Sequence, residues 1–177
     1  MNYKNIVISG GIGSGTSTLA QSLAKTLGWK HYSTGDFFRE YHLENNIPLW
    51  NASAIPPELD RQIDTYIFDQ LSRKEHMVID SHYAGWFTRG LDTVFKVLLR
   101  CEPEDAIVRV INRHHTHKET REDVLERIKQ LDHKFRSLYA DENYLDPRHY
   151  NLVLDTTKST PDDTLKETLK AVEKGLP

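Results

Sequence analysis

Short apolar runs alternate along the chain with longer segments in which apolar side chains recur every three or four positions. The short runs are typical of buried β-strands and lie at residues 4–9, 77–80, 94–99 and 150–155. Segment 17–27 has helical spacing instead, with Leu19, Leu23 and Leu27 on one side and Gly28 directly after it. The pattern therefore predicts strands that alternate with helices.

Further helices are indicated by start signals. One begins at Pro56-Pro57, and another at Pro103, with Arg109 and Arg113 expected one turn apart on its polar face. Thr120 and Asp123 resemble a capping box that opens a long helix. Its apolar stripe comprises Val124, Ile128, Leu131, Phe135 and Leu138. The last helix is expected to begin at Thr160-Pro161 and to end at Gly175.

This alternation predicts an α/β fold over one domain, residues 1–177: a five-stranded, mainly parallel sheet with helices on both faces. Ligands of such folds bind at the carboxyl ends of the strands. No apolar run approaches the roughly 18 residues of a membrane helix, and the N-terminus lacks signal-peptide features, so we expect a cytoplasmic protein without a membrane partner. A net charge of −3 disfavours a broad nucleic-acid surface, and the single Cys101 is given no role.

Candidate chemistry begins with the glycine-rich turn between the first strand and helix, "SGGIGSGTST". It nearly matches the phosphate-binding pattern G-x-x-x-x-G-K-[ST], in which backbone N–H groups and the helix N-terminus hold phosphate oxygens. We therefore expect phosphate binding by the whole loop: Gly10, Gly11, Ile12, Gly13, Ser14, Gly15, Thr16, Ser17 and Thr18. Thr16 stands where the pattern has lysine, so phosphoryl transfer would need a cation from elsewhere.

The stretch "YSTGDFFRE" resembles the S-x-G-D-x-x-R motif of the nucleoside monophosphate kinases through Ser33, Gly35, Asp36 and Arg39. The resemblance implies that Arg39 holds the acceptor's phosphate and that Asp36 lies near magnesium and the attacking oxygen. By itself, the stretch fits an ordinary capped helix with an exposed arginine better, and the preceding phosphate loop is what favours the motif.

Two further segments narrow the resemblance. "DSHYAGWF" and "YNLVLDTTKSTPDD" are similar to stretches of the archaeal-type cytidylate kinases, and together the similar segments span nearly the whole chain. That family includes members with threonine in place of the loop lysine. The resemblance implies a P-loop NTPase three-layer sandwich with two helical insertions, a nucleoside-monophosphate-binding region at 34–75 and a lid at 109–136.

Asp80 ends an apolar strand, where a carboxylate is placed to orient magnesium-bound water, and Ser17 is the expected direct Mg²⁺ ligand. A simple strand-end cap is the alternative for Asp80. Departures from the family also stand out, because His82 replaces an arginine, Asn151 an aspartate and Lys129 an arginine. Each substitution removes or alters a charge.

Replacement cations are expected in the lid, whose tip would be "HHTHKE". Arg113 and Arg136 are favoured as catalytic, although Arg109, Lys129 and Arg136 also fit solvated helix faces. Asp60 and Arg61 resemble the family's L-D-R-x segment near the acceptor nucleotide, or form a surface ion pair. Three histidines, His114, His115 and His117, do not make a convincing zinc site. Four aromatic residues could shape a base pocket or belong to the core: Phe37, Phe38, Trp50 and Trp86.

Together these features predict ATP- and Mg²⁺-dependent phosphoryl transfer to a nucleoside monophosphate, CMP or dCMP first. The catalytic residues would be Asp36, Asp80, Arg113 and Arg136, with acceptor-binding residues Ser33, Gly35, Arg39, Asp60, Arg61 and His82. The partners would be small nucleotides and no nucleic acid, and the chain a monomer or homodimer. Two alternatives remain open: a P-loop kinase of another small acceptor, and a non-catalytic nucleotide-binding protein.

Overall fold

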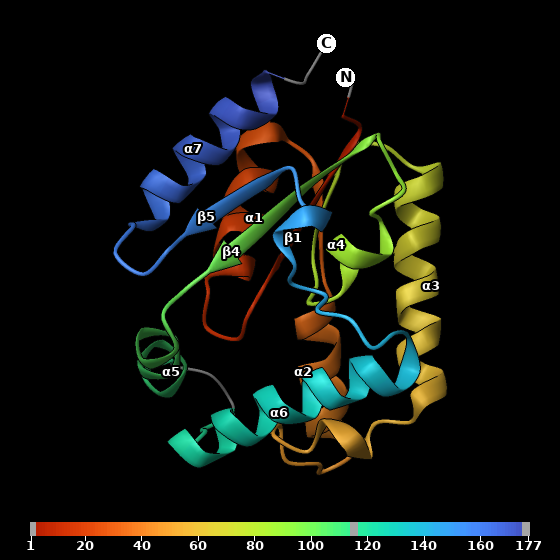
Figure 1. Cartoon of the computed structure of the whole chain (residues 1–177), viewed down its shortest axis with the longest axis vertical. Helices are drawn as coiled ribbons and strands as arrows, with labels where there is room; N and C mark the ends of the chain where they lie inside the picture. Colours follow the sequence, from red (N-terminus) through yellow and green to blue (C-terminus); the bar gives the residue numbers. More distant parts are fainter. Residues whose placement is uncertain (1–2, 114–116, 175–177) are drawn as a thin grey trace.

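A computed structural model describes residues 3–113 and 117–174 as a sheet of parallel strands with helices on both faces (Figure 1). The strands are β1 (Asn5–Gly10), β2 (Lys30–Ser33), β3 (Met77–Asp80), β4 (Val94–Arg100) and β5 (Leu152–Asp155), in the order β2-β3-β1-β4-β5. Every neighbouring pair is parallel. The expected five-stranded α/β fold is therefore confirmed.

The helices of the described residues connect these strands. They are α1 (Thr16–Leu27), α2 (Thr34–Glu44), α3 (Pro57–Arg73), α4 (Ala84–Phe87), α5 (Pro103–Ile111), α6 (Arg121–Leu138) and α7 (Pro161–Glu173), with short 3-10 turns η1 (Ala52–Ala54) and η2 (Pro147–His149). Capping boxes open α6 at Thr120 and α7 at Thr160, and Gly28 ends α1 with a φ of 68°. The start signals in the sequence therefore predicted these helix boundaries well.

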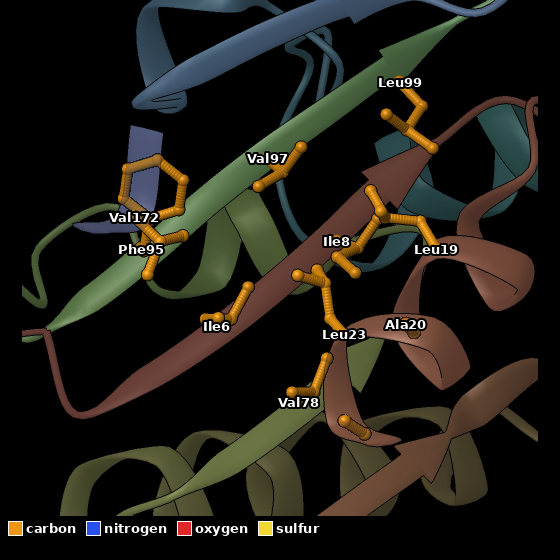
Figure 2. Packing of buried hydrophobic residues seen from close by; sticks show 11 residues of the cluster. Ile6, Ile8, Leu19, Ala20, Leu23, Val78, Phe95, Val97, Leu99 and Val172 are labelled. Atoms are coloured by element: carbon orange, nitrogen blue, oxygen red, sulfur yellow. The ribbon is translucent and has the colours of Figure 1, made fainter. Parts of the chain in front are cut away.

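The core has two layers because β1 alternates its buried side chains between the two faces of the sheet. Ile6 and Ile8 pack with Leu23 of α1 and Val172 of α7, and Figure 2 shows these side chains gathered on one face. Val7 points to the other face and packs with residues of α3 and α4. The central strand is buried along its whole length, which fixes the loop that follows it.

One strand was not located from the sequence: β2 has no apolar run, because its residues Lys30–Ser33 are mostly half-exposed at the sheet edge. Two expectations about helices were wrong. Arg113 does not share a helical face with Arg109, since α5 ends at Ile111. Ile128 is 41% exposed, although the periodicity placed it in the buried stripe of α6. The expected helix end at Gly175 lies outside the described residues.

α5 and α6 lie beyond the carboxyl ends of the strands in Figure 1, where the loop after β1 also lies. η1, which follows α2, packs against α6. This end of the sheet carries the candidate site.

Candidate active site

The phosphate loop joins the carboxyl end of β1 to α1, and two of its glycines are required by close approach. A Cβ at Gly13, whose φ is 83°, would collide with the carbonyl oxygen of Ala106. A Cβ at Gly10 would lie only 2.7 Å from the carbonyl oxygen of Leu99. α1 begins without a side-chain cap or an acidic residue in its first turn. Its N–H groups and positive dipole end are therefore available to an anion.

Asp80 is buried at the end of β3 and lies within a polar network. Its Oδ2 accepts hydrogen bonds from the hydroxyls of Ser17, at 2.7 Å, and Ser33, at 3.0 Å. Its Oδ1 lies 2.6 Å from Nε2 of His31. A carboxylate beside the first hydroxyl of the helix supplies the hard oxygen ligands that Mg²⁺ prefers, so these two residues fit a magnesium site. His31 was not singled out from the sequence.

A cavity beside the loop, here the loop cavity, brings cationic side chains to the position of the missing lysine. It is lined by Gly11, Ile12, Gly13, Thr16, Ser17, Thr34, Gly35, Arg39, Asp80, Ser81, His82, Arg113 and Arg127. Three guanidinium groups therefore surround a site whose own loop has no cation. Arg39 comes from α2, Arg113 from the segment after α5 and Arg127 from α6.

Arg127 of α6 was missed by the sequence interpretation. Its guanidinium lies 3.0 Å from the carboxylate of Glu119, and both side chains are largely buried. Burial, together with the nearby Arg113 and Arg39, lowers the pKa of Arg127 to about 10 against the opposing effect of Glu119. Arg127 therefore stays charged at neutral pH. A signal was available, because it lies one turn after the buried Val124 and beside the apolar stripe of α6.

A second cavity, the α6 cavity, is formed by α2, the segment around η1, α3 and α6. It is lined by Thr34, Gly35, Phe38, Arg39, His42, Leu49, Ala52, Ile55, Asp60, Asp64, Ser81, His82, Tyr83, Arg127, Leu131 and Lys134. It meets the loop cavity at shared lining residues that include Arg39, His82 and Arg127. A ligand in the α6 cavity can therefore approach a phosphate held by the loop.

A third cavity, the α7 cavity, lies on the other side of the loop and shares Gly13 and Arg113 with the loop cavity. Arg109 lines it and donates hydrogen bonds to the carbonyl oxygens of Thr156, at 2.6 Å, and Thr157, at 3.1 Å. These contacts hold the guanidinium in place beside the loop.

His82 does not replace the charge of an arginine. Its Nδ1 lies 3.0 Å from the carbonyl oxygen of Gly10, which can only accept, so Nδ1 is the protonated nitrogen. Burial lowers the pKa of His82 below its usual value, against the smaller opposing effect of that hydrogen bond. The ring is therefore neutral at pH 7 and ties the β3–α4 segment to the phosphate loop.

The remaining predicted residues lie at the edge of these cavities or away from them. The hydroxyl of Ser33 caps α2 by accepting a hydrogen bond from the backbone N–H of Asp36. The carboxylate of Asp36 pairs with Arg39, and the Asp36 side chain is 61% exposed. Arg136 pairs with Asp132 and Asp141 on the exposed side of α6 and lines none of the three cavities. Arg61 is also exposed, 4.0 Å from Glu58.

Several other candidates have packing roles. Asn151 accepts a hydrogen bond from the backbone N–H of Lys96 at 2.8 Å, so it joins β5 to β4. Trp86 belongs to a buried aromatic cluster with Tyr83, Phe135 and Tyr144, whereas Phe38 lines the α6 cavity. Trp50 lines none of the three cavities described above.

The histidines of the predicted lid tip are only partly described, because His114 and His115 lie outside the described residues. Within residues 3–113 and 117–174, no three histidine, cysteine or acidic side chains gather as a metal site would require. None of the helices in these ranges combines the length and apolar character needed to cross a membrane.

Comparison with known proteins identifies the family. A family model described as an AAA domain matches residues 6–130. The cytidylate kinase of Sulfurisphaera tokodaii is 30% identical over 165 residues, 91% of either chain. The cytidylate kinase of Haloarcula marismortui is 31% identical over 97% of this chain and 91% of its own. The chain belongs to the cytidylate kinase family, within the AAA-domain P-loop proteins. The expectation of a P-loop nucleoside monophosphate kinase is thereby confirmed.

Solved structures confirm the P-loop kinase fold of this cytidylate kinase family member. A gluconokinase from Sinorhizobium meliloti has a TM-score of 0.67 at 15% identity, with 98% of this chain and 94% of that one covered. A shikimate kinase from Acinetobacter baumannii has a TM-score of 0.62 at 16% identity, and the match covers 97% of this chain and 94% of the shikimate kinase chain. Identities this low show the fold alone.

Proposed function

We propose that this kinase transfers the γ-phosphoryl group of ATP to the phosphate of CMP or dCMP. The observation that carries the proposal is the α6 cavity, which meets the loop cavity at Arg39, His82 and Arg127. An acceptor bound there would present its phosphate to the donor held by the loop. The cytidylate kinases among the relatives support a cytosine nucleotide as that acceptor.

The donor binds across the loop and the α7 cavity in this proposal. The N–H groups of residues 10–18 hold the triphosphate, and the adenine base lies against Arg109, whose guanidinium is fixed by the carbonyl oxygens of Thr156 and Thr157. Ser17 and, through water, Asp80 would hold Mg²⁺, which would neutralise phosphate charge. Asp36 remains a predicted participant in organising this ion.

The arginines replace the missing loop lysine. Phosphoryl transfer needs positioning and compensation of charge on the transferring group more than it needs covalent chemistry by the protein. Arg39 clamps the acceptor phosphate, whose oxygen attacks the γ-phosphorus in line as the bond to ADP breaks. Arg113 and Arg127, which line the loop cavity, stabilise the charge on the transferring group.

The helical insertions keep their predicted roles in this proposal. Region 34–75 supplies Asp60 and the walls of the acceptor cavity, and region 109–136 supplies Arg113 and Arg127 as a lid over the loop. Closure of a lid would exclude water, which competes with the acceptor for the phosphoryl group. A cytoplasmic location among free nucleotides also belongs to the proposal.

The test is to incubate the purified protein with ATP, Mg²⁺ and, separately, CMP, dCMP, UMP, AMP and GMP, and to quantify each diphosphate. We expect CDP and dCDP to form fastest. Asp80→Asn should abolish turnover while ATP still binds. Asp92 is an exposed residue before β4, so Asp92→Asn should leave turnover unchanged. ATP binding without any diphosphate product would contradict the proposal and favour another acceptor or a non-catalytic nucleotide-binding protein.

A further inference from the structure

The α6 cavity has two chemically different ends. Arg39 and Arg127 line it where it meets the loop cavity, whereas Asp60 and Asp64 of α3 and Lys134 of α6 line only the α6 cavity. Apolar side chains suited to a flat ring also line it, namely Phe38, Leu49 and Leu131. A nucleotide with its phosphate at the arginines would therefore carry its base toward the acidic end.

Lys134 is buried at this end, and its ammonium is held by groups of the protein. Only 8% of the residue is exposed, and its ammonium lies 2.6 Å from Oδ2 of Asp60. The same Nζ donates to the carbonyl oxygen of Ala52, at 2.9 Å, and approaches that of Ile55, at 3.5 Å. The ammonium therefore pairs with the Asp60 carboxylate and donates hydrogen bonds to two carbonyl oxygens of the protein. Lys134 therefore acts on neighbouring protein groups and not on the ligand directly.

Asp60 is the group that Lys134 fixes. Burial raises the pKa of Asp60, which favours its neutral form, and the contact with Lys134 opposes this effect. An ionised carboxylate only accepts hydrogen bonds, whereas a protonated one can also donate. By favouring the ionised form of Asp60, Lys134 favours a side chain that only accepts hydrogen bonds from a ligand.

An obligate acceptor discriminates between pyrimidines at position 4. Cytosine carries an amino donor there, and uracil carries a carbonyl acceptor. The amino group of cytosine can donate a hydrogen bond to Asp60. The carbonyl oxygen of uracil cannot, because both it and the carboxylate are acceptors, and both would remain unpaired in a buried site.

We propose that Lys134 is a positioning residue that fixes Asp60 as an acceptor for an exocyclic amino group, so that the pair selects a 4-aminopyrimidine nucleotide over its 4-oxo counterpart. The inference rests on the proposed function, because it takes the α6 cavity as the acceptor site. It assigns to Lys134 a specificity role that no local pattern indicates, since a lysine on a polar helix usually lies in solvent.

A ligand series tests the pair in the unmodified protein. CMP, UMP and the analogue with hydrogen at position 4 of the ring are compared as acceptors by kcat/KM and by calorimetric binding. We expect the order CMP, then the 4-hydrogen analogue, then UMP. CMP should exceed UMP by about ten- to a hundredfold, the value of a hydrogen bond to a charged group. UMP equal to CMP, or better than the 4-hydrogen analogue, would overturn the inference.

Variants separate the two residues. Asp60→Asn places an amide that can donate to a 4-oxo group, so the ratio of kcat/KM for CMP to that for UMP should fall toward or below one. Lys134→Met should lower the same ratio, and Lys134→Arg, which keeps the charge, should restore part of it. Lys129→Met on the same helix is the matched control, because Lys129 is 79% exposed. A purely structural role for Lys134 would change turnover of both nucleotides equally and leave the ratio unchanged.

The two proposals fail in different ways. Absence of turnover with every monophosphate in the unmodified protein would contradict the proposed function itself. Turnover of CMP with an unchanged CMP-to-UMP ratio in Asp60→Asn and Lys134→Met would keep the proposed function and overturn this inference. If the variants do not fold, the ligand series decides alone, because it leaves the protein unaltered.

Discussion

Thr16 removes one positive charge from the phosphate loop, and the neighbouring residues show how that charge can be replaced. Arg39, Arg113 and Arg127 line the same cavity as Thr16 although they come from distant parts of the chain. The buried Glu119 beside Arg127 holds this guanidinium in a fixed position. A preorganised cation costs no reorganisation during the reaction, so it can serve as well as a mobile lysine.

The first prediction compares two arginines of α6 that the sequence alone does not distinguish. Both substitutions are made in a Glu119→Gln background, because removing Arg127 alone would leave a buried carboxylate unpaired. Arg127→Met should then lower kcat by about a hundredfold, which is the usual effect of losing one hydrogen-bond donor to the transition state. Arg136→Met should change kcat by less than about twofold, since Arg136 pairs with exposed carboxylates. Steady-state kinetics at saturating ATP and CMP measure both effects. Equal losses would mean that the loop cavity is not the reaction site.

Local sequence patterns predicted which residues would lie near one another. The phosphate loop, Ser17 with Asp80, and Arg39 with Gly35 lie together at the loop cavity as the motifs suggested. The interpretation missed Arg127 and Lys134 because both belong to a largely polar helix. Their burial depends on how α6 packs on η1 and on the segment after α5, which are contacts between distant parts of the chain.

At the scale of elements, α6 connects several parts of the site. It carries Arg127 to the loop cavity and Lys134 to Asp60 of α3, and its Gln130 accepts hydrogen bonds from Ser53 of η1. The region predicted as a lid is therefore bonded to the region predicted to bind the acceptor. We infer that a motion of α6 would carry the walls of the acceptor cavity with it.

The second prediction uses the capping boxes that open α6 and α7. Thr120 and Thr160 each accept a hydrogen bond from an aspartate N–H at 3.2 Å, so Thr120→Ala and Thr160→Ala should each lower the free energy of unfolding by about 1 kcal/mol. Urea denaturation measures these losses. Only Thr120→Ala should also lower kcat at saturating nucleotides, because α6 carries Arg127. An equal decrease of kcat in both variants would attribute it to general destabilisation.

Strands and helices differed in how well the sequence located them. Long amphipathic segments and capping residues gave the helices, and fully apolar runs gave the central strands. β2 was not located from the sequence, because this short edge strand has no periodic pattern of apolar residues. Its position depends on pairing with β3. The end of α5 was missed because Asn112 and Arg113 do not interrupt a helical pattern by themselves.

At the scale of the whole molecule, the parallel sheet brings polar ends together from distant parts of the chain. β1 and β3 end at the phosphate loop and at Asp80, and beyond them α3 places two buried acidic groups and α6 a buried lysine. Asp64 is only 7% exposed and accepts a hydrogen bond from Tyr139 at 2.6 Å. Burial, with the nearby Asp60, raises the pKa of Asp64 to about 7, against the opposing effects of Tyr139 and Lys134.

The third prediction follows from this carboxyl group. Between its unfolded pKa of 3.8 and its folded pKa of about 7, Asp64 holds a proton in the folded protein that the unfolded chain has released. The free energy of unfolding should therefore fall as pH rises through this interval, by a contribution on the order of a few kcal/mol, and this contribution should level off above pH 7.

Asp64→Asn isolates that contribution, because an amide stays neutral and can still accept the hydrogen bond of Tyr139. Urea unfolding at pH 5, 6, 7 and 8 should show the variant gaining stability relative to the unmodified protein as pH rises. Asp69→Asn is the control on α3, since Asp69 is 47% exposed and 3.8 Å from Arg73, and it should leave the slope unchanged. Parallel curves for Asp64→Asn and the unmodified protein would show that Asp64 is already ionised at pH 5. The acidic end of the α6 cavity would then carry two negative charges against the single ammonium of Lys134.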